Sequence, residues 1–206
     1  MLHEDHYLTV QQKVDQDRFK KYPVRPQRIA DHFSKILADA GITSGKVLEI
    51  GGRANPMSKY LAPGFEYLHL DMAETGPGVV IADITDCPQL ETGSFDVILS
   101  IDVFEHINRP WLAASEISRL LRPGGVAYTS TIFAWRYHPC PIDYWRFTPA
   151  CLSYLFSELT VLEAGFDKSE RRRNMIGKGG NRVEPDGFGG WRENWRVFHA
   201  GQKPLA

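Results

Sequence analysis

The sequence predicts an α/β fold in which a mostly parallel sheet is covered by helices on both faces. Short apolar segments such as 95–100 alternate along the chain with segments of helical spacing. Glycines and acidic residues follow several of the apolar segments directly, as they do at the ligand-binding edge of such sheets. The chain has 206 residues, of which 43% are hydrophobic, so it is long enough for one domain with a well-filled core.

The N-terminal part of the chain is expected to be an arm followed by a helix. Residues 1–24 are polar and charged, and we interpret them as an arm that precedes a single domain over residues 25–206. Segment 26–40 has apolar residues at helical spacing, and Gly41 supplies a stop. The apolar positions of this helix are Ile29, Phe33, Ile36 and Leu37.

Strands and helices then alternate to the end of the chain. The first strand, 46–50, leads into a glycine turn, and Asn55-Pro56 can open a short helix. Pro110 is well placed at the first position of another helix, which Arg122-Pro-Gly-Gly125 closes. The other strands are predicted at 67–71, 79–82, 95–100, 126–130, 159–164 and 195–200, and the last helix at 148–156.

Composition excludes several classes of function. A net charge of −1 and a pI near 6.7 argue against a nucleic-acid partner or a membrane surface. Three cysteines without CxxC spacing argue against a disulfide framework or a thiolate metal site, and we assign no metal. The sequence has no signal-peptide pattern and no apolar run long enough to span a bilayer, so we expect a cytoplasmic protein.

Polar residues follow four successive strands of the predicted sheet. Gly51 and Gly52 after the first strand allow the backbone to approach a ligand closely. Asp71 after the second strand can accept hydrogen bonds from both hydroxyls of a ribose, and Asp83 beside apolar Ile84 suits an adenine. Each acid alone is more often a turn or cap residue. Together with the end of the fourth strand, however, these sites describe a pocket for an adenosine that carries a short tail.

The combination resembles class I S-adenosylmethionine (SAM)-dependent methyltransferases of the type 11 group. The resemblance extends over about residues 40–165, through "VLEIG" at 47–51, Asp71, Asp83, "FDVILSIDVFEH" at 95–106 and "LRPGG" at 121–125. It implies a Rossmann-like, seven-stranded sheet with an antiparallel last strand at 195–200, and SAM as the cofactor. In the roles that it implies, Glu49, Gly51 and Gly52 hold the methionine end of SAM, Asp71 the ribose, Asp83 and Ile84 the adenine, and Ser100 and Ile101 line the methionine side. Asn55 and Met72 are further expected cofactor contacts.

The glycine loop departs from the pattern of this family. Arg53 and Asn55 replace two glycines, and Asn tolerates the left-handed backbone better than most residues. Three placements of the Arg53 side chain are open: it points to solvent, it pairs with the cofactor's carboxylate, or it blocks the cofactor. A non-catalytic member of the fold that binds an adenosine ligand or a partner is therefore an alternative. A NAD-dependent oxidoreductase is a third, although it leaves Asp83 and Glu105-His106 without a role.

Segment 131–148, which we call the acceptor segment, is rich in aromatic residues and is expected to line the pocket for the methyl acceptor. Tyr137, Asp143, Tyr144 and Arg146 are its candidate substrate contacts. His138 is the first candidate for a general base and His106 the second, because an unperturbed histidine titrates near neutral pH. In the competing interpretation, Tyr144, Trp145 and Phe147 are core, Asp143 and Arg146 form a structural ion pair, and Thr148-Pro149 caps a helix.

A glycine-rich loop at 167–190 is the last candidate feature. Residues 168–182 carry six basic side chains and one acidic side chain. Such a loop can fold over a phosphate-bearing acceptor, or it can be a solvated surface loop. From these observations we expect a SAM-dependent methyltransferase that methylates an oxygen or nitrogen of a small-molecule acceptor, with a carbohydrate or a secondary metabolite favoured. The sequence does not indicate an oligomeric state.

Overall fold

The fold is described from a computed structural model of the full chain. The structure describes residues 25–52, 56–73, 75–135, 137, 139, 141–167, 170–172, 192–194 and 196–205. The predicted arm and the sequence predictions for Arg53, Asn55 and His138 lie outside these residues, as does most of the basic loop.

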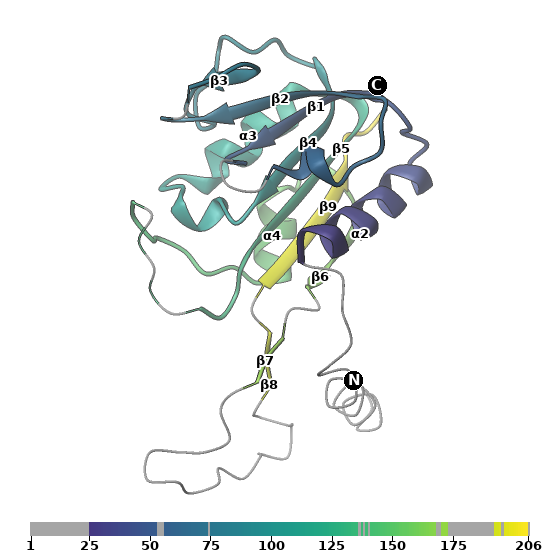
Figure 1. Cartoon of the computed structure of the whole chain (residues 1–206). Coiled ribbons are helices and arrows are strands. Elements are labelled where there is room, and N and C mark those ends of the chain that lie inside the picture. The colour runs from purple at the N-terminus through teal and green to yellow at the C-terminus, as the bar shows by residue number, and fades with distance from the viewer. Residues whose placement is uncertain are drawn as a thin grey trace, which may run out of the picture.

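A seven-stranded sheet forms the centre of the molecule, and it confirms the predicted fold class (Figure 1). The strand order is β3-β2-β1-β4-β5-β9-β6. Neighbouring strands from β3 to β5 are parallel, whereas β9 is antiparallel to both β5 and β6. The strands are β1 (Gly45–Ile50), β2 (Phe65–Asp71), β3 (Val79–Ile81), β4 (Phe95–Ile101), β5 (Leu121–Ile132), β6 (Thr160–Phe166) and β9 (Arg196–Gln202).

Helices cover both faces of this sheet. In Figure 1, α2 (Arg25–Asp39) lies in front of the sheet, and α3 (Pro110–Leu120) and α4 (Pro149–Leu155) lie behind it. Two single 3₁₀ turns, η2 (Met57–Lys59) and η3 (Phe104–His106), follow β1 and β4. No helix in the described part of the chain combines the length and the apolar character that a membrane span needs.

The structure differs from the sequence prediction at three places. The predicted helix after Asn55-Pro56 is only η2, and the following β2 starts at residue 65. Strand β5 begins at Leu121, directly after α3, because Pro123 and Gly124 cannot continue a helix. Strand β7 (Glu170–Arg172), at the start of the predicted basic loop, pairs with β8 (Arg192–Asn194), just after it, in a separate two-stranded sheet.

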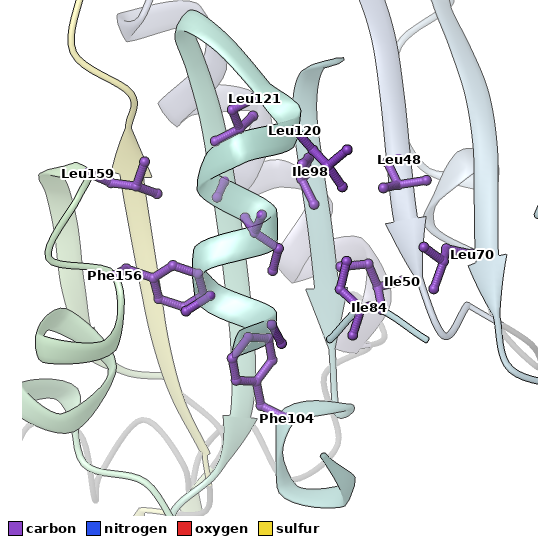
Figure 2. Packing of buried hydrophobic residues seen from close by; sticks show 14 of the residues in the cluster. Leu48, Ile50, Leu70, Ile84, Ile98, Phe104, Leu120, Leu121, Phe156 and Leu159 are labelled. Atoms are coloured by element: carbon purple, nitrogen blue, oxygen red, sulfur yellow. The ribbon is translucent and has the colours of Figure 1, made fainter. Parts of the chain in front are cut away.

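The apolar core has two parts, one on each face of the sheet. On the α2 face, Phe33 of α2 and Tyr128 of β5 pack with a ring-centroid distance of 5.3 Å. On the other face, a larger cluster surrounds α3, and Figure 2 shows its members Ile98, Phe104 and Phe156 among others. Both phenylalanines are fully buried. This second cluster fixes the segment after β4, which carries several candidate site residues.

A histidine without hydrogen-bond partners lies in the core on the α3 and α4 face. His199 of β9 has no exposed surface, and neither ring nitrogen has a partner. Its ring stacks on Phe156 with centroids 5.2 Å apart. Gly201 leaves the space for this ring, because a Cβ at position 201 would lie 2.7 Å from His199 Cε1. Burial therefore lowers the pKa of His199 from 6.5 to about 4.

We expect His199 to make the fold sensitive to acid. Because its pKa is lower in the folded state than in the unfolded state, the stability that it contributes is complete above pH 6.5 and is lost as the pH falls through 4. The full loss is roughly 3 kcal/mol. In urea titrations between pH 7 and pH 4, His199→Leu should reduce the fall in the free energy of unfolding by about this amount. If the free energy of unfolding of the variant fell as much as that of the wild type, this assignment would be wrong.

Candidate functional site

The candidate site lies along one edge of the sheet, where the parallel strands end. In the registers of the sheet, Ile50 of β1 pairs with both Leu70 of β2 and Ser100 of β4, and Asp71 pairs with Ile81 of β3. The residues that follow these strands therefore lie next to one another, as predicted for the carboxyl edge of a parallel sheet.

Both glycines of the turn after β1 pack closely against their surroundings. Gly51 has a φ of +73°, and a Cβ there would lie 2.7 Å from Val103 Cγ2. A Cβ on Gly52 would lie 2.6 Å from Cδ of Glu49. The turn thus packs its backbone directly against the segment after β4 and against a carboxylate.

Glu49 is a buried acid directly beneath this turn. Its side chain is 2% exposed, and both carboxylate oxygens accept the backbone N–H of Met57, at 2.9 and 3.0 Å. His69 of β2 places Nδ1 3.5 Å from Oε2. Burial raises the pKa of Glu49 to about 7, against the smaller opposing effect of the Met57 N–H. The carboxylate is therefore held close to its midpoint of ionisation at neutral pH.

The acids after β2 and β3 each organise a turn. Asp71 is 8% exposed, and its Oδ1 accepts the backbone N–H of Ala73 at 2.9 Å. Oδ1 of Asp83 accepts both the backbone N–H and the hydroxyl of Thr85, each at 2.8 Å. The neighbours of these acids differ: Ile84 is buried, whereas the side chain of Met72 is 70% exposed.

The end of β4 adds contacts that the sequence analysis missed. Ser100 is buried and its hydroxyl has no partner, while Ile101 is half-buried. Asp102 has a φ of +55° and donates its backbone N–H to the carbonyl of Ser130. Arg196 Nε donates to the Asp102 carboxylate at 2.9 Å, and its guanidinium carbon lies 5.2 Å from the ring centre of Trp135.

Glu105 is the second fully buried acid near this edge. Its Oε2 accepts the hydroxyl of Thr131 at 2.6 Å, whereas its Oε1 has no hydrogen-bond partner. Burial raises the pKa of this carboxyl group above its ordinary value. The backbone carbonyl of Glu105 accepts the N–H groups of Tyr144 at 2.8 Å and Trp145 at 3.3 Å. Glu105 therefore joins the turn after β4 to the acceptor segment.

His106 makes a further connection to the same segment. Its Nδ1 lies 2.7 Å from the carbonyl of Ile142 and must donate, since a carbonyl oxygen only accepts. Nε2 lies 3.9 Å from Glu105 Oε1. The imidazole side chain is only 16% exposed. These contacts anchor the acceptor segment, and they support a positioning role for His106.

The acceptor segment is also tied together internally. Arg146 Nη2 donates to the Asp143 carboxylate at 2.7 Å, and the same guanidinium donates to the carbonyls of Trp135 and Trp145. The Asp143 carboxylate is fully buried. This is the ion pair of the structural interpretation, and Phe147, which is 2% exposed, belongs to the core. Thr148 likewise caps α4, since its hydroxyl accepts the backbone N–H of Cys151.

Two tyrosines of the acceptor segment remain accessible to a substrate. Tyr137 is 70% exposed and Tyr144 is 44% exposed. Among the described residues, no group of three or more His, Cys, Asp and Glu side chains is arranged to hold a metal ion.

Comparison with known proteins agrees with this geometry. The family described as "Methyltransferase domain" (type 11) matches residues 39–129. An uncharacterized methyltransferase of Mycobacterium sp. (strain JLS) is 35% identical over 95 residues, which are 41% of this chain and 37% of that relative. A ubiquinone biosynthesis O-methyltransferase of Aromatoleum aromaticum is 26% identical over 109 residues, 46% of this chain and 47% of the relative. These matches thus span less than half of either relative.

A solved structure agrees over most of its length. Burkholderia thailandensis 1,6-didemethyltoxoflavin-N1-methyltransferase, with bound 1,6-didemethyltoxoflavin and S-adenosylhomocysteine, aligns with a TM-score of 0.59 and 17% identity. The alignment covers 99% of this chain and 92% of that one. Residues 39–129 thus match a methyltransferase domain, and the fold around them is shared with a SAM-dependent methyltransferase.

The family match ends at residue 129 and therefore covers the cofactor side of this methyltransferase but not the acceptor segment. On the cofactor side, the residues present are compatible with SAM, the cofactor of the family. A Cβ on Gly51 or Gly52 would meet Val103 or Glu49, so glycine lets this turn lie close to the Glu49 carboxylate. The match to a methyltransferase domain favours SAM over the nicotinamide cofactor of a NAD-dependent oxidoreductase.

Proposed function

We propose that this protein transfers a methyl group from SAM to an oxygen or nitrogen of a small-molecule acceptor. The observation that carries the proposal is the placement of Glu49, Gly51, Asp71 and Asp83 at successive strand ends on one edge of the sheet. An adenosine with an amino-acid tail requires this set of groups along a single edge. Because the matched relatives are longer than the matched region, the reaction of the whole protein is part of the proposal.

In this proposal each strand end holds one part of SAM. Glu49 faces the ammonium group, and the Gly51-Gly52 turn with Asn55 carries the methionine tail. Asp71 accepts the ribose hydroxyls beside Met72, and Asp83 with Ile84 receives the adenine. Ser100 and Ile101 line the methionine side. Among the described residues of this set, all except the exposed Met72 are buried or half-buried. This burial supports an enclosed cofactor.

SAM supplies a methyl group on a sulfonium, which is already activated for displacement. The protein's own residues therefore have to align the acceptor atom with that methyl group and exclude water. The Glu105, His106 and Arg146 contacts that hold the acceptor segment serve this alignment. If the acceptor atom carries a proton, His138 is our first candidate base and His106 the second. Because His106 donates from Nδ1, its Nε2 is the nitrogen that could accept the proton.

The acceptor is proposed to be a small molecule of the carbohydrate or secondary-metabolite class. Tyr137 and Tyr144 are exposed and available to contact it, while Asp143 and Arg146 contribute through the ion pair that shapes the segment. The similar proteins named above include one O-methyltransferase and one N-methyltransferase, so the comparison leaves both acceptor atoms open. A phosphate on the acceptor would fit the basic residues of 168–182.

The replacement of two loop glycines by Arg53 and Asn55 favours a second candidate, a non-catalytic protein that binds an adenosine ligand. The two candidates differ in turnover. Purified protein incubated with SAM carrying a deuterated methyl group and a small-molecule extract should yield S-adenosylhomocysteine (SAH) together with a deuterium-labelled product. SAH binding without either product, across extracts and pH values, would support the non-catalytic candidate.

Glu49 should couple cofactor binding to proton release. A bound ammonium group favours the carboxylate, so binding of SAH at pH 6 should release up to about one proton from a group whose pKa is about 7 in the free protein. Calorimetric titrations in two buffers of different ionisation enthalpy measure this proton. Glu49→Gln should bind SAH more weakly and release none. Equal proton release from the variant would show that Glu49 does not face the ammonium.

A further inference from the structure

Two tryptophans lie together at the carboxyl edge of the sheet, and the proposed methyl transfer has no role for them so far. Trp111 belongs to the first turn of α3, and Trp145 to the acceptor segment. Their ring centroids are 6.4 Å apart with planes at 78°. Their exposed fractions are 51% and 38%, and neighbouring Tyr144 is 44% exposed. Large rings exposed together in this way mark a binding surface more often than scattered single residues do.

The backbone holds both tryptophans in fixed positions. Trp111 follows Pro110 at the start of α3, whose opposite side is buried through residues such as Ala114 and Ile117. Trp145 donates its N–H to the carbonyl of Glu105, and its own carbonyl accepts Arg146 Nη1 at 2.8 Å. Binding of a ligand to the pair therefore orders little additional backbone, and this low cost favours affinity.

The acidic side chains of the acceptor segment and of the end of β4 are paired or enclosed. In the described part of the acceptor segment, the Asp143 carboxylate is fully buried and paired with Arg146. At the end of β4, Asp102 is paired with Arg196. Glu105 is enclosed and accepts the Thr131 hydroxyl. The surface beside the tryptophans thus offers ring faces and edges, with the exposed Arg109 two positions before Trp111.

From these observations we propose that Trp111 and Trp145 form a platform that binds a neutral ring of the methyl acceptor by stacking. This inference rests on the proposed function, since it concerns the acceptor of that reaction. An aromatic ring and the apolar face of a sugar ring both stack on indole, so both sources share this chemistry. The platform would hold the ring while the acceptor atom reaches the edge of the sheet near Ser100.

The test uses the full chain saturated with SAH and two neutral probes, catechol and methyl β-glucoside. Saturation-transfer NMR titrations give the affinity of each probe. At least one probe should bind, and Trp111→Ala and Trp145→Ala should each weaken it about tenfold. Trp111→Phe, which keeps a ring, should restore most of the loss. Tyr154→Ala removes another strongly exposed ring, on α4, and should leave binding unchanged.

The outcomes separate this inference from the proposed function. Binding of catechol alone identifies an aromatic acceptor, and binding of the glucoside alone identifies a sugar. If SAH binds with wild-type affinity in all variants but neither probe binds, or if probe binding is unaffected by both Trp→Ala changes, the platform is overturned. If the Trp→Ala variants sediment differently from the wild type but bind the probes equally well, the platform is overturned, and the pair is a contact between protein chains. Failure of SAH to bind the wild type would instead remove the proposed function.

Discussion

Asp71→Ala is expected to weaken SAH binding by about tenfold to a hundredfold. A hydrogen bond to a charged group contributes about 1.5–3 kcal/mol, and the variant leaves the ribose hydroxyls without their acceptor. The carboxylate lies at the end of β2 and is only 8% exposed, so water cannot readily replace it. Isothermal titration calorimetry of the purified chain with SAH measures the change.

Two further variants separate ribose binding from an effect on the fold. Asp71→Asn keeps an oxygen for the backbone N–H of Ala73 and should lose less affinity than the alanine variant. Glu66→Ala removes an exposed carboxylate from the other half of β2 and should bind SAH normally. If Asp71→Ala also bound SAH like the wild type, the assignment of the end of β2 to the ribose would be wrong.

Phe104→Ala should lower the free energy of unfolding by about 3–5 kcal/mol, the usual cost of removing a fully buried phenylalanine. Phe104 has no exposed surface, and its ring packs at centroid distances of 6.3 Å from Phe147 and 5.5 Å from Phe156. Urea denaturation followed by circular dichroism measures the loss. Phe104→Leu preserves most of the volume and should cost clearly less.

The same substitution should loosen the acceptor segment. Phe104 immediately precedes Glu105, whose carbonyl holds the N–H groups of Tyr144 and Trp145. Amide hydrogen exchange at these two residues should therefore accelerate in Phe104→Ala, while exchange in β1 changes only with global stability. A loss of less than 1 kcal/mol with unchanged exchange would show that this cluster does not support the segment.

The sheet could be predicted because its strands are local patterns. Apolar segments such as 95–100 are buried on both faces, and glycine or proline ends the helices before them. The positions of Glu49, Asp71 and Asp83 followed from the same pattern, because parallel strands bring their carboxyl ends to one edge. Their roles in cofactor binding remain predictions.

Other contacts of the site depend on residues far apart in the sequence. Arg196 meets Asp102 across 94 residues because β9 inserts beside β5 in antiparallel register. The tryptophan pair forms because η3 and α3 bring the start of a helix against the acceptor segment. Neither periodicity nor spacing carries this information. The left-handed backbone of Asp102 also has no signal in the sequence, since aspartate visits this region only occasionally.

The acceptor segment shows how one set of residues supports two interpretations. Its aromatic and charged composition suggested a substrate pocket, and the structure places Asp143, Arg146 and Phe147 in contacts that hold the segment together. Its exposed rings, Tyr137, Tyr144 and Trp145, are the part that can meet an acceptor. Burial, which the sequence does not reveal for an aromatic residue, separates the two groups.

The most direct test of the central claim is calorimetric titration of the full chain with SAM and with SAH. Our account predicts that both ligands bind saturably at a single site, and that SAH competes with SAM for it. Absence of binding at millimolar concentrations of either ligand would contradict the account, because the strand-end residues would then not form an adenosyl pocket.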